Sequence, residues 1–172
     1  MAKVAFILDE MFEDAEFRVP YDRVKEAGHK PVVIGLRDSK KLEGKKGKEK
    51  VTTEVAIDSV SATDFAGLVI PGGYSPDKIR TNKGMVELTR TMVESGKPVA
   101  AICHAGWMLA EADVVQGKTV TSWPSIKTDL INAGANWVDQ EVVEDDNIIT
   151  SRKPDDLEAF SKALLSQIEQ RS

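Results

Sequence analysis

The chain has 172 residues, a net charge of −5, one cysteine and two histidines. With 41% hydrophobic and 30% charged residues, it has the composition of a folded domain with a sizeable core, not of a disordered chain. A single cysteine excludes an internal disulfide framework and fits a reducing compartment, so a cytoplasmic location is expected. The negative charge argues against nucleic acid as the main partner. The apolar stretch at residues 4–8 is too short for a membrane span.

Apolar runs and amphipathic segments alternate along the chain as strands and helices do in layered folds. Strands are predicted at residues 3–8, 30–36, 65–70, 99–102 and 119–122, with a final hairpin of residues 141–143 and 148–151. Helices are predicted at residues 14–27, 83–95, 125–133 and 155–170. Pro20 is expected to kink or break the first helix. The alternation predicts one α/β domain, residues 1–172, with a mostly parallel sheet.

A basic segment, residues 40–50, lies between the second and third predicted strands. Gly44 and Gly47 are typical of a hairpin tip, and the surrounding lysines are expected to be solvated. The segment lacks the order G-x-x-x-x-G-K-[ST] of a phosphate loop, and G-x-G-x-x-G occurs nowhere in the chain. Nucleic-acid binding by this segment is therefore disfavoured.

Cys103 lies between the predicted strand at residues 99–102 and a helix-like segment. Ala101 and Ala105 flank it at minus two and plus two, where a sharp strand-to-helix turn accepts only small side chains. This is the steric pattern of a nucleophile elbow, with a thiol in place of the usual hydroxyl. The start of the helix is expected to favour the thiolate, and His104 follows directly.

Simpler interpretations of these residues stay open from the residues alone. A lone cysteine among apolar neighbours is usually a small buried side chain without chemistry. A metal site is disfavoured, because one cysteine with His29 and His104 offers no repeated ligand spacing. His29 is expected in a solvated turn. We expect neither a metal nor an organic cofactor.

Three predicted strands end in residues suited to a site. The first runs into the acidic turn at residues 9–14, the third into Gly72, Gly73 and Tyr74, and the fourth into Cys103. The carboxyl ends of parallel strands lie at one edge of a sheet, where ligands bind. We therefore expect the three loops to meet, although the glycine pair alone indicates no more than a tight turn.

A thiolate that attacks a carbonyl group needs a lowered pKa, a proton shuttle and donors for the oxyanion. His104 is the candidate shuttle, and the backbone N–H groups of Gly73 and His104 are the candidate oxyanion donors. Glu13 allows three roles. The first role is that of a protonated carboxyl that donates a hydrogen bond to sulfur, and the second is that of a general base for the substrate. In the third, Glu13 merely favours the first turn of a helix.

Several long motifs resemble the PfpI family, in the family's order and over nearly the whole chain. They are FEDAE (12–16), PYDRVKEAGH (20–29), LVIPGG (68–73), PVAAICH (98–104) and INAGANWVD (131–139). This family includes archaeal intracellular proteases and bacterial stress proteins. It belongs to the superfamily of the Parkinson's-disease protein deglycase and the class I glutamine amidotransferases. The resemblance implies a flavodoxin-like three-layer sandwich and assembly into a homo-oligomer.

The resemblance also implies roles for single residues. Cys103 would be the nucleophile, Glu13 would hydrogen-bond to it, and His104 would be the partner base. Asp77, which follows the Pro-Gly-Gly turn, would reach His104 from a neighbouring subunit. The implied activities are removal of early glyoxal adducts from proteins and nucleotides, conversion of methylglyoxal to lactate, peptidase activity and chaperone-like protection under stress.

Three positions depart from the family pattern. Asp77 replaces a typical glutamate, Trp123 stands where a tyrosine is common, and Trp107 belongs to a segment that replaces Gly-Pro-Gln. With Gly72 and Tyr74, the two tryptophans are expected to line the pocket. These changes weaken the peptidase interpretation most, because a loosely held histidine protonates a leaving amine poorly.

The leading hypothesis is a stress-protective enzyme of the deglycase or glyoxalase III type. It would use the Cys103 thiolate on small reactive aldehydes or on their early adducts with proteins. The alternatives are a redox-sensing or chaperone-like stress protein with little turnover, an oligomer-dependent cysteine peptidase, and an inert paralogue.

Overall fold

The computed structural model describes residues 1–171 and is built around a seven-stranded sheet with the order β10-β11-β7-β6-β1-β2-β5. All neighbouring pairs are parallel except β10 and β11, which form an antiparallel hairpin. The strands are β1 (Lys3–Ile7), β2 (Lys30–Gly35), β5 (Val55–Ala56), β6 (Gly67–Ile70), β7 (Val99–Ile102), β10 (Val142–Asp145) and β11 (Ile148–Ser151). This arrangement confirms the predicted α/β class with a mostly parallel sheet.

Helices and two small strand pairs complete the described chain. The helices are α1 (Asp14–Glu26), α2 (Ser75–Ile79), α3 (Lys83–Glu94), α4 (Gly106–Glu111), α5 (Lys127–Asn132) and α6 (Leu157–Arg171). The additional pairs are β3 (Lys41–Glu43) with β4 (Lys50–Thr52), and β8 (Thr119–Val120) with β9 (Asn136–Trp137). The strand predicted at residues 119–122 is thus shorter and lies outside the main sheet. Among residues 1–171, no helix is both long and apolar enough to cross a membrane.

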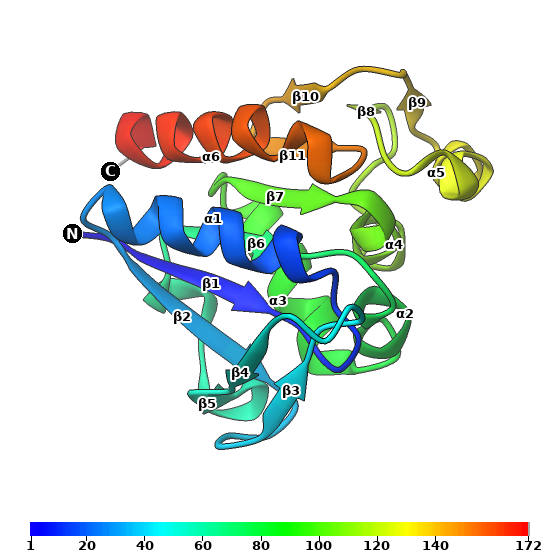
Figure 1. The fold of residues 1–172 in the computed structure, drawn as a ribbon. Coiled ribbons are helices and arrows are strands. Elements are labelled where there is room, and N and C mark those ends of the chain that lie inside the picture. Colours follow the sequence, from blue (N-terminus) through cyan, green and yellow to red (C-terminus); the bar gives the residue numbers. More distant parts are fainter. Residues whose placement is uncertain (172) are drawn as a thin grey trace.

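Helices cover both faces of the sheet, because successive strand residues face opposite sides. Phe6 belongs to the core that includes Phe17 of α1 and Phe160 of α6, whereas Ile7 belongs to the core that includes Met92 of α3. Figure 1 shows α1 and α6 side by side over one face, with α3 behind the sheet. The central order β2-β1-β6-β7-β11 is that of a flavodoxin-like fold, so the predicted sandwich is confirmed.

Pro20 lies inside α1 and does not break it, contrary to one of the two outcomes expected. The helix is continuous from Asp14 to Glu26, and Pro20 is itself buried. Proline at this place removes the backbone bond to the carbonyl of Glu16, one turn earlier. Burial of the neighbouring apolar residues Phe17 and Val24 against the sheet offsets that loss.

The loops after β1 and β6 are joined by backbone hydrogen bonds at the carboxyl edge of the sheet. Phe12 and Gly73 form an antiparallel bridge, the N–H of Glu13 donates to the carbonyl of Gly72 at 3.1 Å, and that of Tyr74 donates to Met11 at 2.8 Å. Since β6 also pairs with β7, the loop after β7 lies beside them. The predicted convergence of the three loops is therefore confirmed.

The bridge makes glycine necessary at position 73. Gly73 has a φ of +81°, and a Cβ there would lie 2.4 Å from the nitrogen of Glu13 and 2.7 Å from the carbonyl oxygen of Met11. Gly28 has a similar φ of +87°, but a Cβ there would meet nothing within 4 Å. A substitution at Gly28 therefore introduces backbone strain alone, whereas a substitution at Gly73 introduces both strain and a steric clash.

Gly73→Ala is expected to lower the free energy of unfolding by about 3 kcal/mol or more, because strain and backbone overlap combine. Gly28→Ala carries strain alone and should cost about 1–2 kcal/mol. Urea unfolding of both variants measures the difference. Equal losses would contradict the tight joint between the two loops.

Candidate active site around Cys103

Cys103 occupies a sharp turn between β7 and a short 3-10 helix, Cys103–Ala105, that leads into α4. Its φ is +63°, in the left-handed region that side chains rarely adopt, so the backbone here is strained. Ala101 and Ala105 are buried on either side, as the elbow pattern predicts. The thiol itself is buried, with 8% of the residue exposed.

Glu16 lies beside the thiol, and Gly72 lies between the two. The N–H of Gly72 donates to Oε1 of Glu16 at 2.8 Å. A Cβ at position 72 would lie 2.5 Å from that oxygen and 2.8 Å from the Cβ of Cys103. The other carboxyl oxygen of Glu16, Oε2, is buried without a hydrogen-bond partner among residues 1–171. One carboxyl and one sulfur therefore share a site that has no room for a side chain at position 72.

The hydrogen bond expected between Glu13 and the sulfur is replaced by two ion pairs. Oε2 of Glu13 lies 2.9 Å from Nζ of Lys45, and Oε1 lies 3.0 Å from Nζ of Lys46. Glu13 precedes α1, whereas Glu16 lies within its first turn and is fully buried. The sequence contains a signal for this: Glu16 shares a helix face with Pro20 and Val24, so it is a charged residue on the buried stripe.

The tip of the β3–β4 hairpin is docked, which corrects the prediction of a solvated tip. The carboxylate of Asp14 accepts backbone N–H groups from Lys46 at 2.8 Å, Lys48 at 2.9 Å and Glu49 at 2.8 Å. Burial would raise the pKa of Asp14, but the three donors outweigh it and lower that pKa. The N–H of Lys45 donates to the carbonyl of Phe12 at 2.8 Å. The tip is thereby fastened to the start of α1.

The electrostatics of the thiol contradict the prediction of a lowered pKa. Burial and the charge of Glu16 raise the pKa of Cys103 to about 12, although the backbone N–H groups of His104 and Gly73 donate to sulfur and oppose the shift. Burial likewise raises the pKa of Glu16 to about 8, against the opposing N–H of Gly72. At neutral pH the buried pair therefore holds its protons.

His104 is positioned to exchange a proton with the thiol. Its Nδ1 lies 3.4 Å from Sγ of Cys103, and its Nε2 lies 3.2 Å from Oγ of Ser125, a residue that the sequence did not single out. Burial and the charge of Lys45 lower the pKa of His104, so the ring is neutral at neutral pH. A neutral ring that donates from Nε2 to Ser125 leaves Nδ1 free to accept from sulfur.

The two predicted tryptophans flank the histidine ring. Ring centroids lie 5.2 Å apart for His104 and Trp107, and 6.5 Å apart for His104 and Trp123. Tyr74 is 61% exposed, and Nζ of Lys45 lies 5.8 Å from its ring centroid. The two tryptophans thus lie beside the histidine of the elbow, and a pocket lined by Gly72, Tyr74, Trp107 and Trp123 stays a prediction.

Two other predicted positions differ from expectation or stay untested. Asp77 is exposed on α2 and makes no ion pair or hydrogen bond with other residues of the described chain, so its contact with His104 stays a prediction about an assembly. His29 is half-buried, not solvated, and its Nδ1 accepts the N–H of Ala2 at 3.1 Å.

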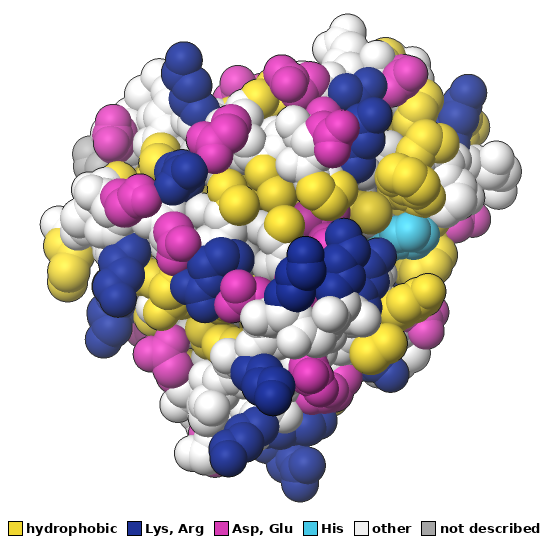
Figure 2. All heavy atoms as spheres, in the orientation of Figure 1, with side chains coloured by type: hydrophobic (Ala, Val, Ile, Leu, Met, Phe, Trp, Pro, Cys, Tyr) yellow, Lys and Arg dark blue, Asp and Glu magenta, His cyan; other side chains and the backbone are white. Residues whose placement is uncertain are grey.

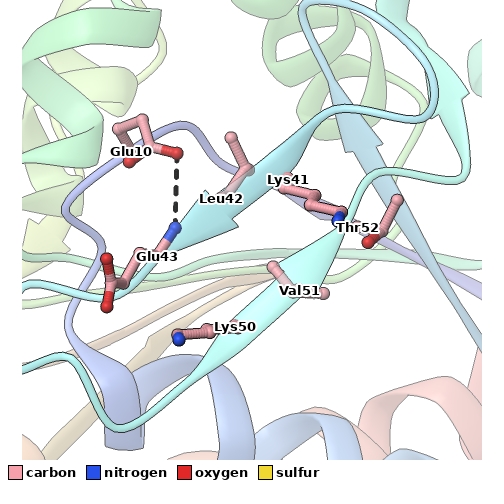
Figure 3. A pocket seen from close by; sticks show the side chains of 7 residues that line it. All are labelled: Glu10, Lys41, Leu42, Glu43, Lys50, Val51 and Thr52. Carbon is pink, nitrogen blue, oxygen red and sulfur yellow. Dashed lines mark hydrogen bonds between the residues drawn. The ribbon is translucent and has the colours of Figure 1, made fainter.

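A hollow of about 460 Å³ is lined by strands β3 and β4 and by one residue of the loop after β1, and none of its lining residues belongs to the elbow (Figure 3). It is lined by Glu10, Lys41, Leu42, Glu43, Lys50, Val51 and Thr52. Oε1 of Glu10 accepts the backbone N–H of Glu43 at 3.3 Å, which ties the loop after β1 to the hairpin. Within residues 1–171, no cluster of His, Cys, Asp and Glu has the arrangement of a metal site.

The fold and the elbow place this chain among α/β sandwich proteins with a cysteine at a strand-to-helix turn. Residues 2–167 match the model of the DJ-1/PfpI family, and the chain belongs to that family. It is 45% identical to "Protein/nucleic acid deglycase 2" of Escherichia coli over 95% of each chain. It is 42% identical to "Deglycase PfpI" of Pyrococcus furiosus, over 93% of this chain and 95% of that one. Among solved structures, Drosophila melanogaster DJ-1beta has a TM-score of 0.88 at 31% identity, over 97% of this chain and 90% of that one.

The raised pKa of Glu16 predicts that stability falls as pH rises from about 4.5 to about 8. In this window the folded chain keeps a proton that the unfolded chain releases, so each pH unit costs up to about 1.4 kcal/mol. Glu16→Gln retains the acceptor for Gly72 but cannot ionise, so its stability should lose that slope and exceed the parent's near pH 8. Urea unfolding across this range measures both.

Glu94→Gln, at an exposed position of α3, is the matched control and should keep the parent slope. A Glu16→Gln profile that runs parallel to the parent profile would show that Glu16 is ionised in the folded protein.

Proposed function

We propose that this protein is an enzyme of the deglycase type that acts on 2-oxoaldehydes and on their early adducts with amines and thiols, with Cys103 as nucleophile. The observation that supports this most strongly is the buried arrangement of Cys103, Gly72 and Glu16, in which the glycine lies against both the carboxyl of Glu16 and the strained residue Cys103. The names of the two deglycase relatives support a deglycase-type role.

In the first step, His104 takes the thiol proton at Nδ1, and protonated Glu16 donates a hydrogen bond that stabilises the sulfur anion. The unpartnered Oε2 is the oxygen available to carry that proton. Sulfur attacks the aldehyde carbon, a C–S bond forms, and the carbonyl electrons move to oxygen. The N–H groups of Gly73 and His104, which already converge on sulfur, are the donors for that oxyanion.

The second step is an internal redox reaction that needs no cofactor. The hydrogen on the carbon bound to sulfur leaves as a proton, and the electron pair passes through an enediol to the adjacent ketone carbon. That carbon gains the proton and becomes an alcohol, while the first carbon becomes a thioester. Water cleaves the thioester, so methylglyoxal and water give lactate and restore the thiol. His104 gives the thiol proton to the new oxyanion at the end of the first step, so it is neutral again and is the base within reach of these protons.

An early adduct enters the same route after one additional bond breaks. A hemithioacetal or hemiaminal loses its thiol or amine, which takes up the hydroxyl proton, and the freed aldehyde reacts with Cys103. The net reaction returns the unmodified thiol or amine and releases a 2-hydroxy acid. Glycated proteins are therefore proposed substrates alongside free aldehydes.

The buried sulfur does not favour the alternative of a redox sensor. Rapid oxidation requires an accessible thiolate, whereas residue Cys103 is only 8% exposed and the pKa of its thiol is raised to about 12. Turnover by a transiently formed thiolate fits the site better than accumulation of a stable one.

Lactate formation from methylglyoxal is expected to vanish in Cys103→Ser and to fall by about 100-fold or more in Glu16→Gln, because the amide is a weaker proton donor to sulfur. The parent kcat/KM should decline above pH 8, where Glu16 loses its proton, given that burial raises its pKa to about 8. An enzymatic lactate assay over a pH series measures both effects.

Glu13→Gln leaves Glu16 intact and should retain the decline at high pH. A parent rate that keeps rising as the solution becomes more alkaline, in step with thiol ionisation alone, would contradict the role of protonated Glu16.

We also propose that the site is completed in a homo-oligomer, where Asp77 of one subunit reaches His104 of another. The exposure of Asp77, and that of the rings of Tyr74 and Trp123, support such a contact. Asp77→Asn should leave the sedimentation mass unchanged but lower turnover about tenfold, since it removes an orienting charge. A monomeric parent protein with full activity would exclude this arrangement.

A further inference from the structure

The hairpin tip places two lysines over the reactive site. Lys45 donates its N–H to Phe12 in the loop after β1, and Asp14 fixes the next residues of the tip through three backbone hydrogen bonds. A Cβ at Gly44 would lie 2.3 Å from the Asp14 carboxylate, so the tip is packed directly on that group. The lysines are therefore carried by an anchored element, not by a mobile loop.

Two ammonium groups pair with one carboxylate at this place, while the nearby carboxylate of Asp14 is held by three backbone N–H groups of the tip. Glu13 is the one carboxylate that pairs with both Lys45 and Lys46. Glu16 is neutral at neutral pH because burial raises its pKa to about 8. The charge of Lys45 opposes the rise that burial causes in the pKa of Cys103, and together with burial it lowers the pKa of His104.

The lysine heads also remain open to solvent. The side chain of Lys45 is 31% exposed and that of Lys46 is 53% exposed, whereas Glu13 beneath them is 4% exposed. Figure 2 shows Lys and Arg side chains gathered directly beside a histidine on this face of the molecule. An incoming group therefore meets ammonium groups before it meets the buried carboxylate.

We propose that Lys45 and Lys46 form an anion subsite beside Cys103, which selects substrates that carry a carboxylate or a phosphate group next to the reactive carbon or adduct. The proposal deepens the proposed function, since it names the substrate class of the same site. Carboxylate-bearing adducts of small thiols and phosphate-bearing adducts of nucleotides share this chemistry.

A pair of alkylating reagents tests the subsite without any turnover. Iodoacetate and iodoacetamide both lose iodide to the Cys103 sulfur and form one C–S bond, but only iodoacetate is an anion. The measured quantity is the rate of alkylation by iodoacetate divided by the rate of alkylation by iodoacetamide. Comparison with the same rate ratio for 2-mercaptoethanol removes the effect of differences in thiol ionisation. The rates are measured by intact mass at one pH and one ionic strength.

The iodoacetate-to-iodoacetamide rate ratio of the parent protein is expected to exceed that of 2-mercaptoethanol by about tenfold, because the two ammonium groups attract the anionic reagent. The double variant Lys45→Gln/Lys46→Gln should lower the ratio to that of 2-mercaptoethanol. Added salt should slow iodoacetate alone. The control is Lys41→Gln/Lys50→Gln, which changes the net charge equally at the hollow of Figure 3 and should keep the parent ratio. Glu13→Gln, which frees both ammonium groups, should raise the ratio.

An unchanged ratio in the Lys45→Gln/Lys46→Gln variant overturns the subsite, whatever the protein does with aldehydes. If Cys103 resists both reagents, inorganic phosphate is titrated against the fluorescence of Trp107 and Trp123, and the absence of a saturable, lysine-dependent change also overturns it. Failure of the proposed function appears separately, as absent lactate formation with an intact alkylation ratio.

Pairs of matched substrates distinguish the two sources of the anion, the carboxylate of a small thiol and the phosphate of a nucleotide. Release of methylglyoxal adducts from N-acetylcysteine is compared with release from its neutral amide, and release from guanosine 5′-monophosphate with release from guanosine. Preference for the charged member of a pair, lost in Lys45→Gln/Lys46→Gln, assigns the subsite to that source, and equal rates in both pairs contradict the proposal.

Discussion

The N–H of Gly72 holds one oxygen of Glu16, while the side chain of Cys103 lies against the other side of the same glycine. This contact forces a carboxyl and a thiol into one water-poor space, where two negative charges cannot coexist at acceptable cost. A proton must remain on the pair. The strained backbone of Cys103 keeps the sulfur there, and the joint between the loops after β1 and β6 keeps the glycine there.

The strand order explains why these parts meet. In a flavodoxin-like sheet the order reverses beside β1, and the loops at that edge leave a crevice for ligands. Cys103, Gly72 and Glu16 follow three adjacent strands, β7, β6 and β1, so residues far apart in the chain become neighbours. The hairpin tip then closes over the same edge through Asp14 and adds positive charge.

Much of this was predictable from the sequence. Small residues around Cys103 predict a strand-to-helix turn because sterics act locally, and the loop convergence follows from the order of strands. The choice between Glu13 and Glu16 was not predictable from loop position alone, because it depends on which turn of α1 faces the sheet. The direction of the thiol pKa also failed, since the helix start acts against desolvation, whose extent only packing reveals.

The hairpin shows a similar limit. Glycine and lysine at residues 40–50 predict a hairpin turn, and a turn is present. No local pattern indicates that Asp14, more than thirty residues earlier, accepts its backbone N–H groups. A hairpin tip that is exposed to solvent and one that is packed against the domain have the same kind of amino-acid composition. Long-range hydrogen bonding by a single carboxylate decides between them.

The chemistry of the site depends on the protonation state of Glu16. A carbon-13 NMR titration of its carboxyl carbon, assigned with the Glu16→Gln variant, measures that state directly. The carboxyl carbon is expected to titrate with a midpoint near pH 8, because burial raises the pKa of Glu16 to about 8. A carboxyl carbon that titrates in the ordinary range of an exposed glutamate, and is ionised at neutral pH, would contradict it.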